Sequence, residues 1–257
     1  MQPGHIALAL VVAGLAYAVW RLARGPRERP AAALPDAYHR LLLAHVDFYA
    51  RLSRPERRHF GERVMGFLAA VRIEGAGFAP DDLDRVLVAA SAQILRFRHA
   101  EARYPGLTEV VLQPDHFDED WTASDPDEDM VGLVGEELLS GTVVLSRPAL
   151  HESFAPDAEL HVGLHEFAHL LDRADGYVDG CPRYYLAPRL RQRWPAIFDA
   201  ELARVRDGGG YLDPYAGEDP GELFAVATEH YFLWPRELRR GHPQLYDLLR
   251  GLYESGK

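Results

Sequence analysis

The spacing of apolar side chains predicts that three helices open the globular part of the chain. Apolar residues recur about one helical turn apart across residues 36–53. The next helix, "SRPERRHFGERVMGFLAAVR", begins with Ser53 as a candidate N-cap and carries a proline in its first turn. A third helix follows the turn "EGAGFAP" and is capped by Asp81 or Asp82.

The pattern then shifts to short β-branched runs before helical spacing returns. Residues 107–114 and 141–146 are bounded by turn-forming residues and predict two strands. The acidic run between them is typical of a solvated loop, because it lacks the alternation and the glycine of an EF-hand. Helices are predicted at 157–174 and 186–206, and again in "GELFAVATEHYFL" and "PQLYDLLRGLYE". The expected fold is α+β, mostly α-helical with a small β-sheet.

The N-terminal segment differs from the rest of the chain. Residues 4–20 are almost wholly apolar and as a helix would span about 25 Å, slightly less than a hydrocarbon core of ~30 Å. Positive charge is absent before this run and abundant after it, which argues against a cleaved signal peptide and for a cytoplasmic domain. We expect a transmembrane anchor helix (1–23), a linker (24–35) and one soluble domain (36–257). There are two alternatives to this topology. The apolar segment could be a helix buried in the soluble domain, or it could be an anchor that leaves the domain in the periplasm.

Composition narrows the classes of function. The net charge of −11 argues against a nucleic-acid partner, because phosphate binding needs clustered cations. The single cysteine, Cys181, permits neither an intramolecular disulfide nor a cysteine-rich zinc site. Its setting, "VDGCPRYY", is typical of a loop rather than of a catalytic nucleophile.

The stretch "LHVGLHEFAHLLDRADG" carries the clearest chemistry. Residues four apart lie on one face of an α-helix, so His165 and His169 can bind one metal ion. A Zn²⁺ ion with three protein ligands keeps a position for water, and Glu166 can accept a proton from that water. The apolar flanks favour a polar face set within a buried helix, although two core histidines with hydrogen-bond partners would give the same pattern.

A third protein ligand has to come from elsewhere. The metzincin pattern fails, because Asp175 stands where that class needs a histidine. Downstream, Glu222 and Glu229 lie seven residues apart on nearly the same helical face, and spacing alone favours neither.

Two neighbours of the motif are expected to act outside the set of metal ligands. His161 lies one turn before His165, and we expect it to face solvent or to support the site indirectly rather than to bind metal. Asp172 could orient His169 through the other ring nitrogen, or pair with Arg173 or with a neighbouring helix.

The motif and its downstream partner resemble a known family. "HEFAHLLD" followed by "DPYAGEDPGELFAVATEHYF" closely resembles the MtfA (Mlc titration factor A) family of bacterial zinc peptidases. The opening helices and the two predicted strands also look like that family's layout, so the resemblance covers roughly residues 36–255. It implies a zincin-like metallopeptidase domain in which His165, His169 and Glu222 bind Zn²⁺. Glu166 would be the general base.

Two details of the resemblance concern single positions. Glu222 is implied because the family's ligand is the glutamate just after the Asp-Pro-x turn. "YAGEDPGELFA" is also similar to a stretch of anthrax lethal factor. This similarity implies that Tyr215 donates its hydroxyl to the oxyanion of the tetrahedral intermediate in peptide hydrolysis. The alternative is that Tyr215 is a loop tyrosine that packs on the helix. Characterised members carry a further histidine where this chain has Gly135 or Glu136, so the resemblance does not extend to a resting state blocked by that histidine.

The resemblance implies a gluzincin-type peptidase (H-E-x-x-H plus Glu) that hydrolyses peptides or proteins by a zinc-activated water, either as an aminopeptidase or as an endopeptidase. With the predicted anchor, it would sit on the inner membrane of a bacterium with its catalytic domain in the cytoplasm. Family members are also known to bind a glucose-responsive transcriptional repressor, so a repressor of sugar uptake is a candidate partner. The alternative function is a non-catalytic protein that sequesters this repressor. Glu166 favours the peptidase, since a structural metal site needs no adjacent base.

Overall fold

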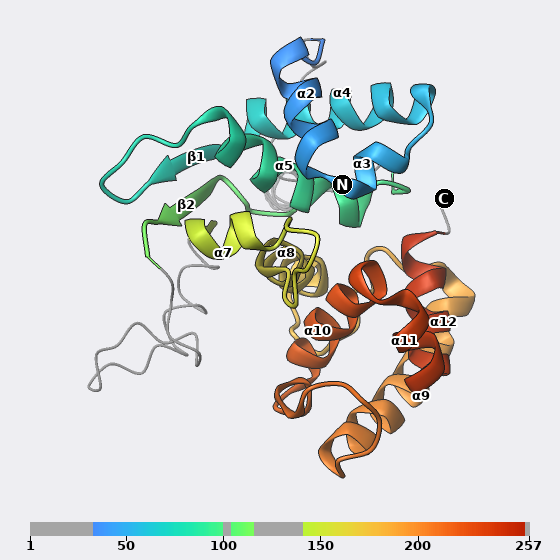
Figure 1. Ribbon diagram of the computed structural model, residues 1–257. Coiled ribbons are helices and arrows are strands. Elements are labelled where there is room, and N and C mark those ends of the chain that lie inside the picture. The colour runs from blue at the N-terminus through green and yellow to red at the C-terminus, as the bar shows by residue number, and fades with distance from the viewer. Residues whose placement is uncertain (1–32, 100–103, 116–140, 255–257) are drawn as a thin grey trace, which may run out of the picture.

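The computed structural model describes residues 33–99, 104–115 and 141–254 (Figure 1). This part of the chain is mostly helical with one small sheet, which confirms the predicted α+β composition. The predicted anchor helix, most of the acidic run, and the positions Gly135 and Glu136 lie outside the described residues. Within the described ranges, no helix has the length and apolar character needed to cross a membrane.

The described chain opens with four helices, and the last two of them begin at capping boxes. They are α2 (Asp36–His45), α3 (Asp47–Arg51), α4 (Arg54–Ala70) and α5 (Asp82–Arg96). The first expected helix is divided in two, because the buried Val46 adopts an extended backbone. The backbone N–H of Ser53 donates to the carboxylate of Glu56, and Asp81 and Asp84 exchange two such bonds.

The sheet formed by the described residues has three parallel strands. In spatial order they are β1 (Arg72–Gly75), β2 (Glu109–Gln113) and β3 (Thr142–Ser146). The two predicted strands are β2 and β3, and in each of them buried side chains alternate with partly exposed ones. Strand β1 was not predicted and replaces the end of an expected helix and the start of an expected turn. Its single large apolar residue, Ile73, is too weak a signal for a strand.

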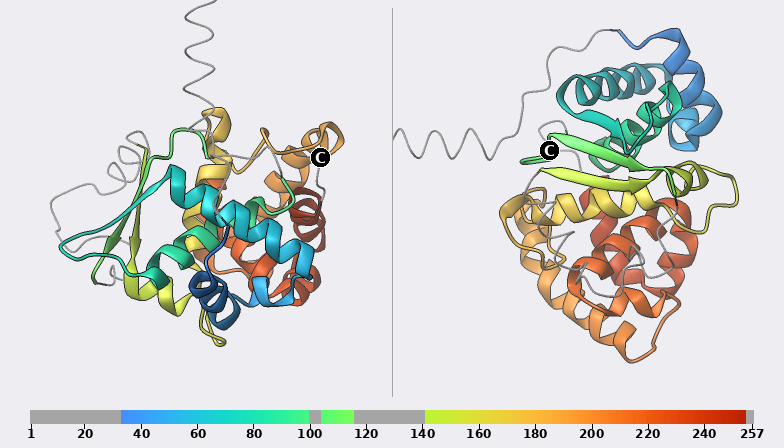
Figure 2. Two further views of the ribbon diagram at one scale, coloured as in Figure 1. Left: turned by 90° about the horizontal axis from the view of Figure 1, so that it is seen from above. Right: turned by 90° about the vertical axis from the view of Figure 1, so that its left-hand side faces the viewer.

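Helices pack on both sides of this sheet. The right-hand view in Figure 2 shows α2–α5 on one side and the yellow to red helices on the other. These later helices are α7 (Arg147–Glu152), α8 (Val162–Asp172), α9 (Pro188–Arg206), α10 (Pro220–Leu233), α11 (Pro235–Gly241) and α12 (Pro243–Tyr253). The short helices α7 and α11 were not predicted, and the motif helix α8 begins five residues later than expected.

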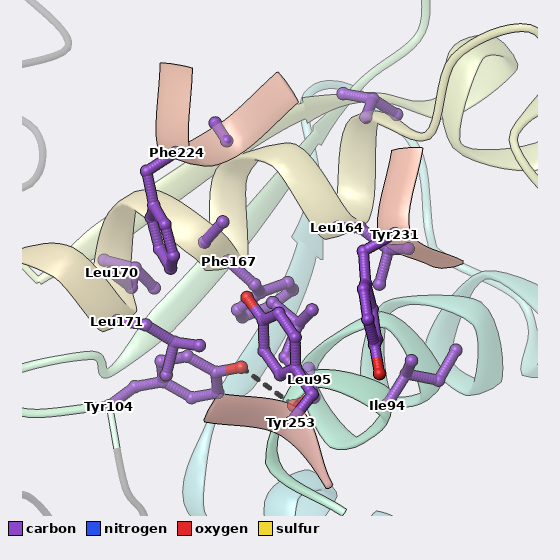
Figure 3. Packing of buried hydrophobic residues seen from close by; sticks show 14 of the residues in the cluster. Ile94, Leu95, Tyr104, Leu164, Phe167, Leu170, Leu171, Phe224, Tyr231 and Tyr253 are labelled. Carbon is purple, nitrogen blue, oxygen red and sulfur yellow. Dashed lines mark hydrogen bonds between the residues drawn. The ribbon is translucent and has the colours of Figure 1, made fainter. Parts of the chain in front are cut away.

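Helix α8 is embedded in the hydrophobic core. It packs against α5 on one side and α10 on another. Figure 3 shows its buried residues among side chains of α5, α10 and α12: Leu164, Phe167, Leu170 and Leu171 with Ile94, Leu95, Phe224, Tyr231 and Tyr253. Burial of one such leucine or phenylalanine contributes roughly 1.5–3 kcal/mol, so this face holds the motif helix firmly in place.

Candidate metal centre

His165, His169 and Glu222 converge on one point from two helices. The histidines lie one turn apart on α8, and Glu222 lies in the first turn of α10. Nε2 of His165 is 3.1 Å from Nε2 of His169 and 3.1 Å from Oε2 of Glu222. Nε2 of His169 is 3.3 Å from Oε1 of Glu222. One potential ligand atom from each of the three residues therefore lies within 4.8 Å of the others.

The local sequence explains why Glu222 reaches this point. Asp219 is the N-cap of α10, and its Oδ1 accepts a hydrogen bond from the N–H of Glu222 at 3.0 Å. Pro220 occupies the first helical position, where its missing N–H costs nothing. Gly221 avoids crowding in this turn, since a Cβ at this position would lie 3.0 Å from Cγ1 of Val178 and 3.1 Å from the capping Oδ1 of Asp219. The first turn of α10 is therefore set directly against the motif helix.

The donor set fits a zinc ion. Zinc binds imidazole nitrogen and carboxylate oxygen at about 2.0–2.1 Å, so ligand atoms around a tetrahedral ion lie about 3.3–3.4 Å apart. The observed separations of 3.1–3.3 Å are close to that value. In addition, Oε2 of Glu222 is buried without a hydrogen-bond partner, although Nε2 of His165 is near. A buried carboxylate oxygen without a partner is costly, and a bound cation would satisfy it.

The charges of the site favour a cation. Burial raises the pKa of Glu222, but contacts with His165 and His169 outweigh it and hold the pKa below its ordinary value. Burial lowers the pKa of His165, but the carboxylates of Glu222 and Glu229 raise it well above the ordinary value. Positive charge is therefore stabilised between these side chains.

Glu166 lies beside the two histidines in a partly buried position. Burial raises the pKa of its carboxyl group, and the opposing effect of His165 and His169 does not cancel this. A carboxylate with a raised pKa is a stronger base than an ordinary glutamate, which suits proton transfer near neutral pH.

Tyr215 is positioned by a short 3-10 helix, η2 (Pro214–Gly217), that precedes α10. Asp213 caps η2 by accepting the N–H of Tyr215 at 2.8 Å. The Tyr215 ring lies 6.4 Å from the His165 ring, centroid to centroid. Burial, followed by the charge of Glu222 and a hydrogen bond to it, raises the pKa of Tyr215. The hydroxyl therefore stays protonated and can act as a donor beside the cluster.

The two glutamates that spacing could not distinguish contact opposite sides of one imidazole. Glu222 lies at Nε2 of His165, whereas Oε1 of Glu229 lies 2.8 Å from Nδ1 of the same ring. The sequence pattern indicated Glu229 only as a possible ligand, and its contact with Nδ1 was not predicted. Its position two turns after Glu222 on the same helical face was the available signal.

Of the two roles expected for His161, the solvent-facing one is wrong, and indirect support of the site agrees with the structure. Its side chain is 4% exposed and caps α8, because Nδ1 accepts the N–H of Leu164 at 3.2 Å. Burial lowers the pKa of His161 to about 4, so the ring is neutral near pH 7. Its backbone N–H donates to Glu229 at 2.7 Å, which links His161 indirectly to the cluster.

Asp172 takes none of the partners considered for it. Its Oδ2 accepts the N–H of Gly180 at 2.8 Å, in the loop after α8, and burial raises its pKa to about 7. No hydrogen bond joins it to His169 or Arg173 within the described residues. Cys181 in the same loop is buried, and burial raises the pKa of its thiol to about 11, which disfavours a reactive thiolate.

A mainly helical domain that sets an H-E-x-x-H helix against a downstream glutamate is typical of metallopeptidases. The family model described as "Glucose-regulated metallo-peptidase M90" matches residues 19–254, and the chain belongs to this family. This match begins at residue 19, whereas the resemblance seen in the sequence covers roughly residues 36–255.

Similarity to individual proteins supports the same family assignment. The chain is 32% identical over 240 residues to "Uncharacterized protein slr2042" of Synechocystis sp., covering 88% of this chain and 85% of the relative. It is 31% identical to "Mlc titration factor A" of Pectobacterium atrosepticum and 29% identical to that of Escherichia coli O139:H28. Each of these two alignments covers 58% of this chain and 60% of the relative. The predicted resemblance to the Mlc titration factor A family is confirmed.

Proposed function

We propose that this protein is a zinc-dependent peptidase whose metal is held by His165, His169 and Glu222. The observation that carries the proposal is the convergence of one ligand atom from each residue within 4.8 Å. Two imidazoles and a carboxylate form a donor set that suits Zn²⁺. Membership of a metallopeptidase family supports peptides as the substrate class.

The remaining residues fit the roles of a gluzincin-type peptidase. When bound, zinc acts as a Lewis acid and lowers the pKa of a water molecule towards neutrality. Glu166 accepts the proton of the attacking water and passes it to the leaving amine. Tyr215 donates its hydroxyl to the negative charge that develops on the peptide carbonyl oxygen. The raised pKa values of Glu166 and Tyr215 support these roles, because one group is a stronger base and the other stays protonated.

Glu222→Ala tests the metal site directly. The purified full-length protein is expected to contain about one equivalent of zinc by elemental analysis and to cleave members of a peptide library. Glu222→Ala removes one ligand, and we expect zinc affinity to fall by more than the ~10–100-fold that loss of an outer partner costs. Glu237→Ala removes an exposed carboxylate from α11 and is expected to retain zinc. Wild-type zinc affinity in Glu222→Ala would contradict the proposed ligand set.

We also propose that residues 1–23 anchor the protein in the bacterial inner membrane with the catalytic domain in the cytoplasm. The support comes from the sequence, where an apolar run is followed by arginines. A C-terminal alkaline phosphatase fusion is expected to be inactive and a C-terminal fluorescent protein fusion to be active. The reverse pattern would place the domain in the periplasm.

A second candidate function is capture of a transcriptional repressor. The observation that favours it is the match to relatives named Mlc titration factor A. Sequestration needs no catalytic base, so a candidate repressor would be retained equally by the wild type and by Glu166→Gln in a pull-down assay. Equal retention together with an inactive wild type would favour sequestration over peptide hydrolysis.

A further inference from the structure

Glu229 receives two hydrogen bonds from the helix that carries the histidines. Its Oε1 lies 2.8 Å from Nδ1 of His165, and its Oε2 accepts the backbone N–H of His161 at 2.7 Å. The residue is 2% exposed, and no arginine or lysine among the described residues forms an ion pair with it. Both oxygens of this buried carboxylate are therefore used by α8.

Helix α10 thus contacts both nitrogens of one imidazole. Glu222, in its first turn, lies at Nε2 of His165, and Glu229, about two turns later, lies at Nδ1. The packing of α10 against α8 fixes both contacts together. One helix therefore supplies a proposed metal ligand and a hydrogen-bond acceptor for the histidine opposite.

We propose that Glu229 is a positioning residue that fixes the tautomer of His165 and holds the start of α8 through His161. The proposal rests on the proposed metal site. An ionised carboxylate only accepts hydrogen bonds, so Nδ1 of His165 carries the hydrogen. The lone pair of the neutral ring is then on Nε2, the atom that faces His169 and Glu222. Carboxylates orient metal-binding imidazoles in this way and raise their basicity.

The hydrogen bond from the backbone N–H of His161 determines how the amide of Glu229→Gln would be oriented. A backbone N–H can only donate, so Glu229→Gln would keep its amide oxygen on His161 and turn its NH₂ towards Nδ1 of His165. Nδ1 then has to accept, and the ring hydrogen moves to Nε2, where it blocks metal binding. The opposite orientation of the amide would set two donors against each other at the start of α8. Glu229→Gln therefore preserves the size of the side chain and reverses the tautomer.

The tautomer can be measured in the metal-free, full-length protein by ¹H–¹⁵N correlation of the histidine rings, at a pH high enough for the His165 ring to be neutral, because its pKa is raised. Signals of His165 are assigned by their absence from His165→Gln. We expect the Nδ1–H form in the wild type and the Nε2–H form in Glu229→Gln, with zinc affinity about 10–100-fold lower by chelator competition. Glu229→Asp keeps an acceptor-only group and is expected to keep the Nδ1–H form.

The chain offers a matched control in a second buried carboxylate–histidine pair. Oε2 of Glu201 lies 2.6 Å from Nδ1 of His242, which is fully buried. Glu201→Gln is expected to lower stability and to leave the tautomer of His165 and the zinc affinity unchanged. An unchanged tautomer in Glu229→Gln, or an equal loss of zinc affinity in Glu201→Gln, would overturn the inference. If the wild type binds no zinc, the proposed function fails, whereas the metal-free spectra still decide the role of Glu229.

Discussion

Glu166→Gln is expected to remove peptide hydrolysis and to leave about one equivalent of zinc bound. The substitution keeps the size of the side chain and removes its capacity to accept a proton. General-base catalysis contributes about 10²–10⁴-fold to a rate, so a fall of that size in kcat/KM is expected. Because Glu166 lies outside the three converging residues, the metal should stay in place.

The measurement pairs steady-state kinetics on a cleaved peptide with elemental analysis of the same protein sample. Glu159→Gln is a suitable control, since it removes an exposed carboxylate shortly before α8. Its kcat/KM and zinc content are expected to match those of the wild type. Activity in Glu166→Gln within tenfold of the wild type would exclude Glu166 as the base. Loss of zinc would instead mean that the residue supports the metal site.

Periodicity in the sequence predicted the parts of the site that depend on a single helix. His165 and His169 share a face because they are four residues apart, and no tertiary information is needed to see this. Glu222 was also readable as a first-turn residue, because Asp219 and Pro220 form a strong helix start. The choice of Glu222 over Glu229 came from the family resemblance, and the structure places both beside His165.

The missed features depend on contacts between elements distant in the chain. His161 resembles a surface histidine in sequence, yet α10 and Phe154 bury it, and its ring caps its own helix. Strand β1 has little strand character and exists because it pairs with β2 from Arg72 to Gly75. Such pairings are set by packing of the whole domain, which local propensity does not encode.

Tyr215→Phe is expected to lower kcat by about 10²–10³-fold and to change KM little. The phenyl ring preserves the packing of η2, and only the hydroxyl is lost. A donor directed at charge that develops during the reaction affects kcat rather than substrate binding, and removal of one such donor has an effect of this size. If Tyr215 only packs against the neighbouring helix, phenylalanine would support wild-type turnover.

Because the Tyr215 hydroxyl also bonds Glu222, zinc affinity has to be measured beside the kinetics. A normal zinc affinity with a lower kcat supports a donor to the reacting peptide. A weaker zinc affinity that accounts for the whole loss would make Tyr215 a support for Glu222 instead. Tyr211→Phe is the matched control. Tyr211 lies on the loop leading to η2, and its hydroxyl lies 2.8 Å from Nδ1 of His230 in α10. Its removal is expected to leave kcat unchanged, because this hydroxyl bonds His230 rather than a residue of the proposed metal site.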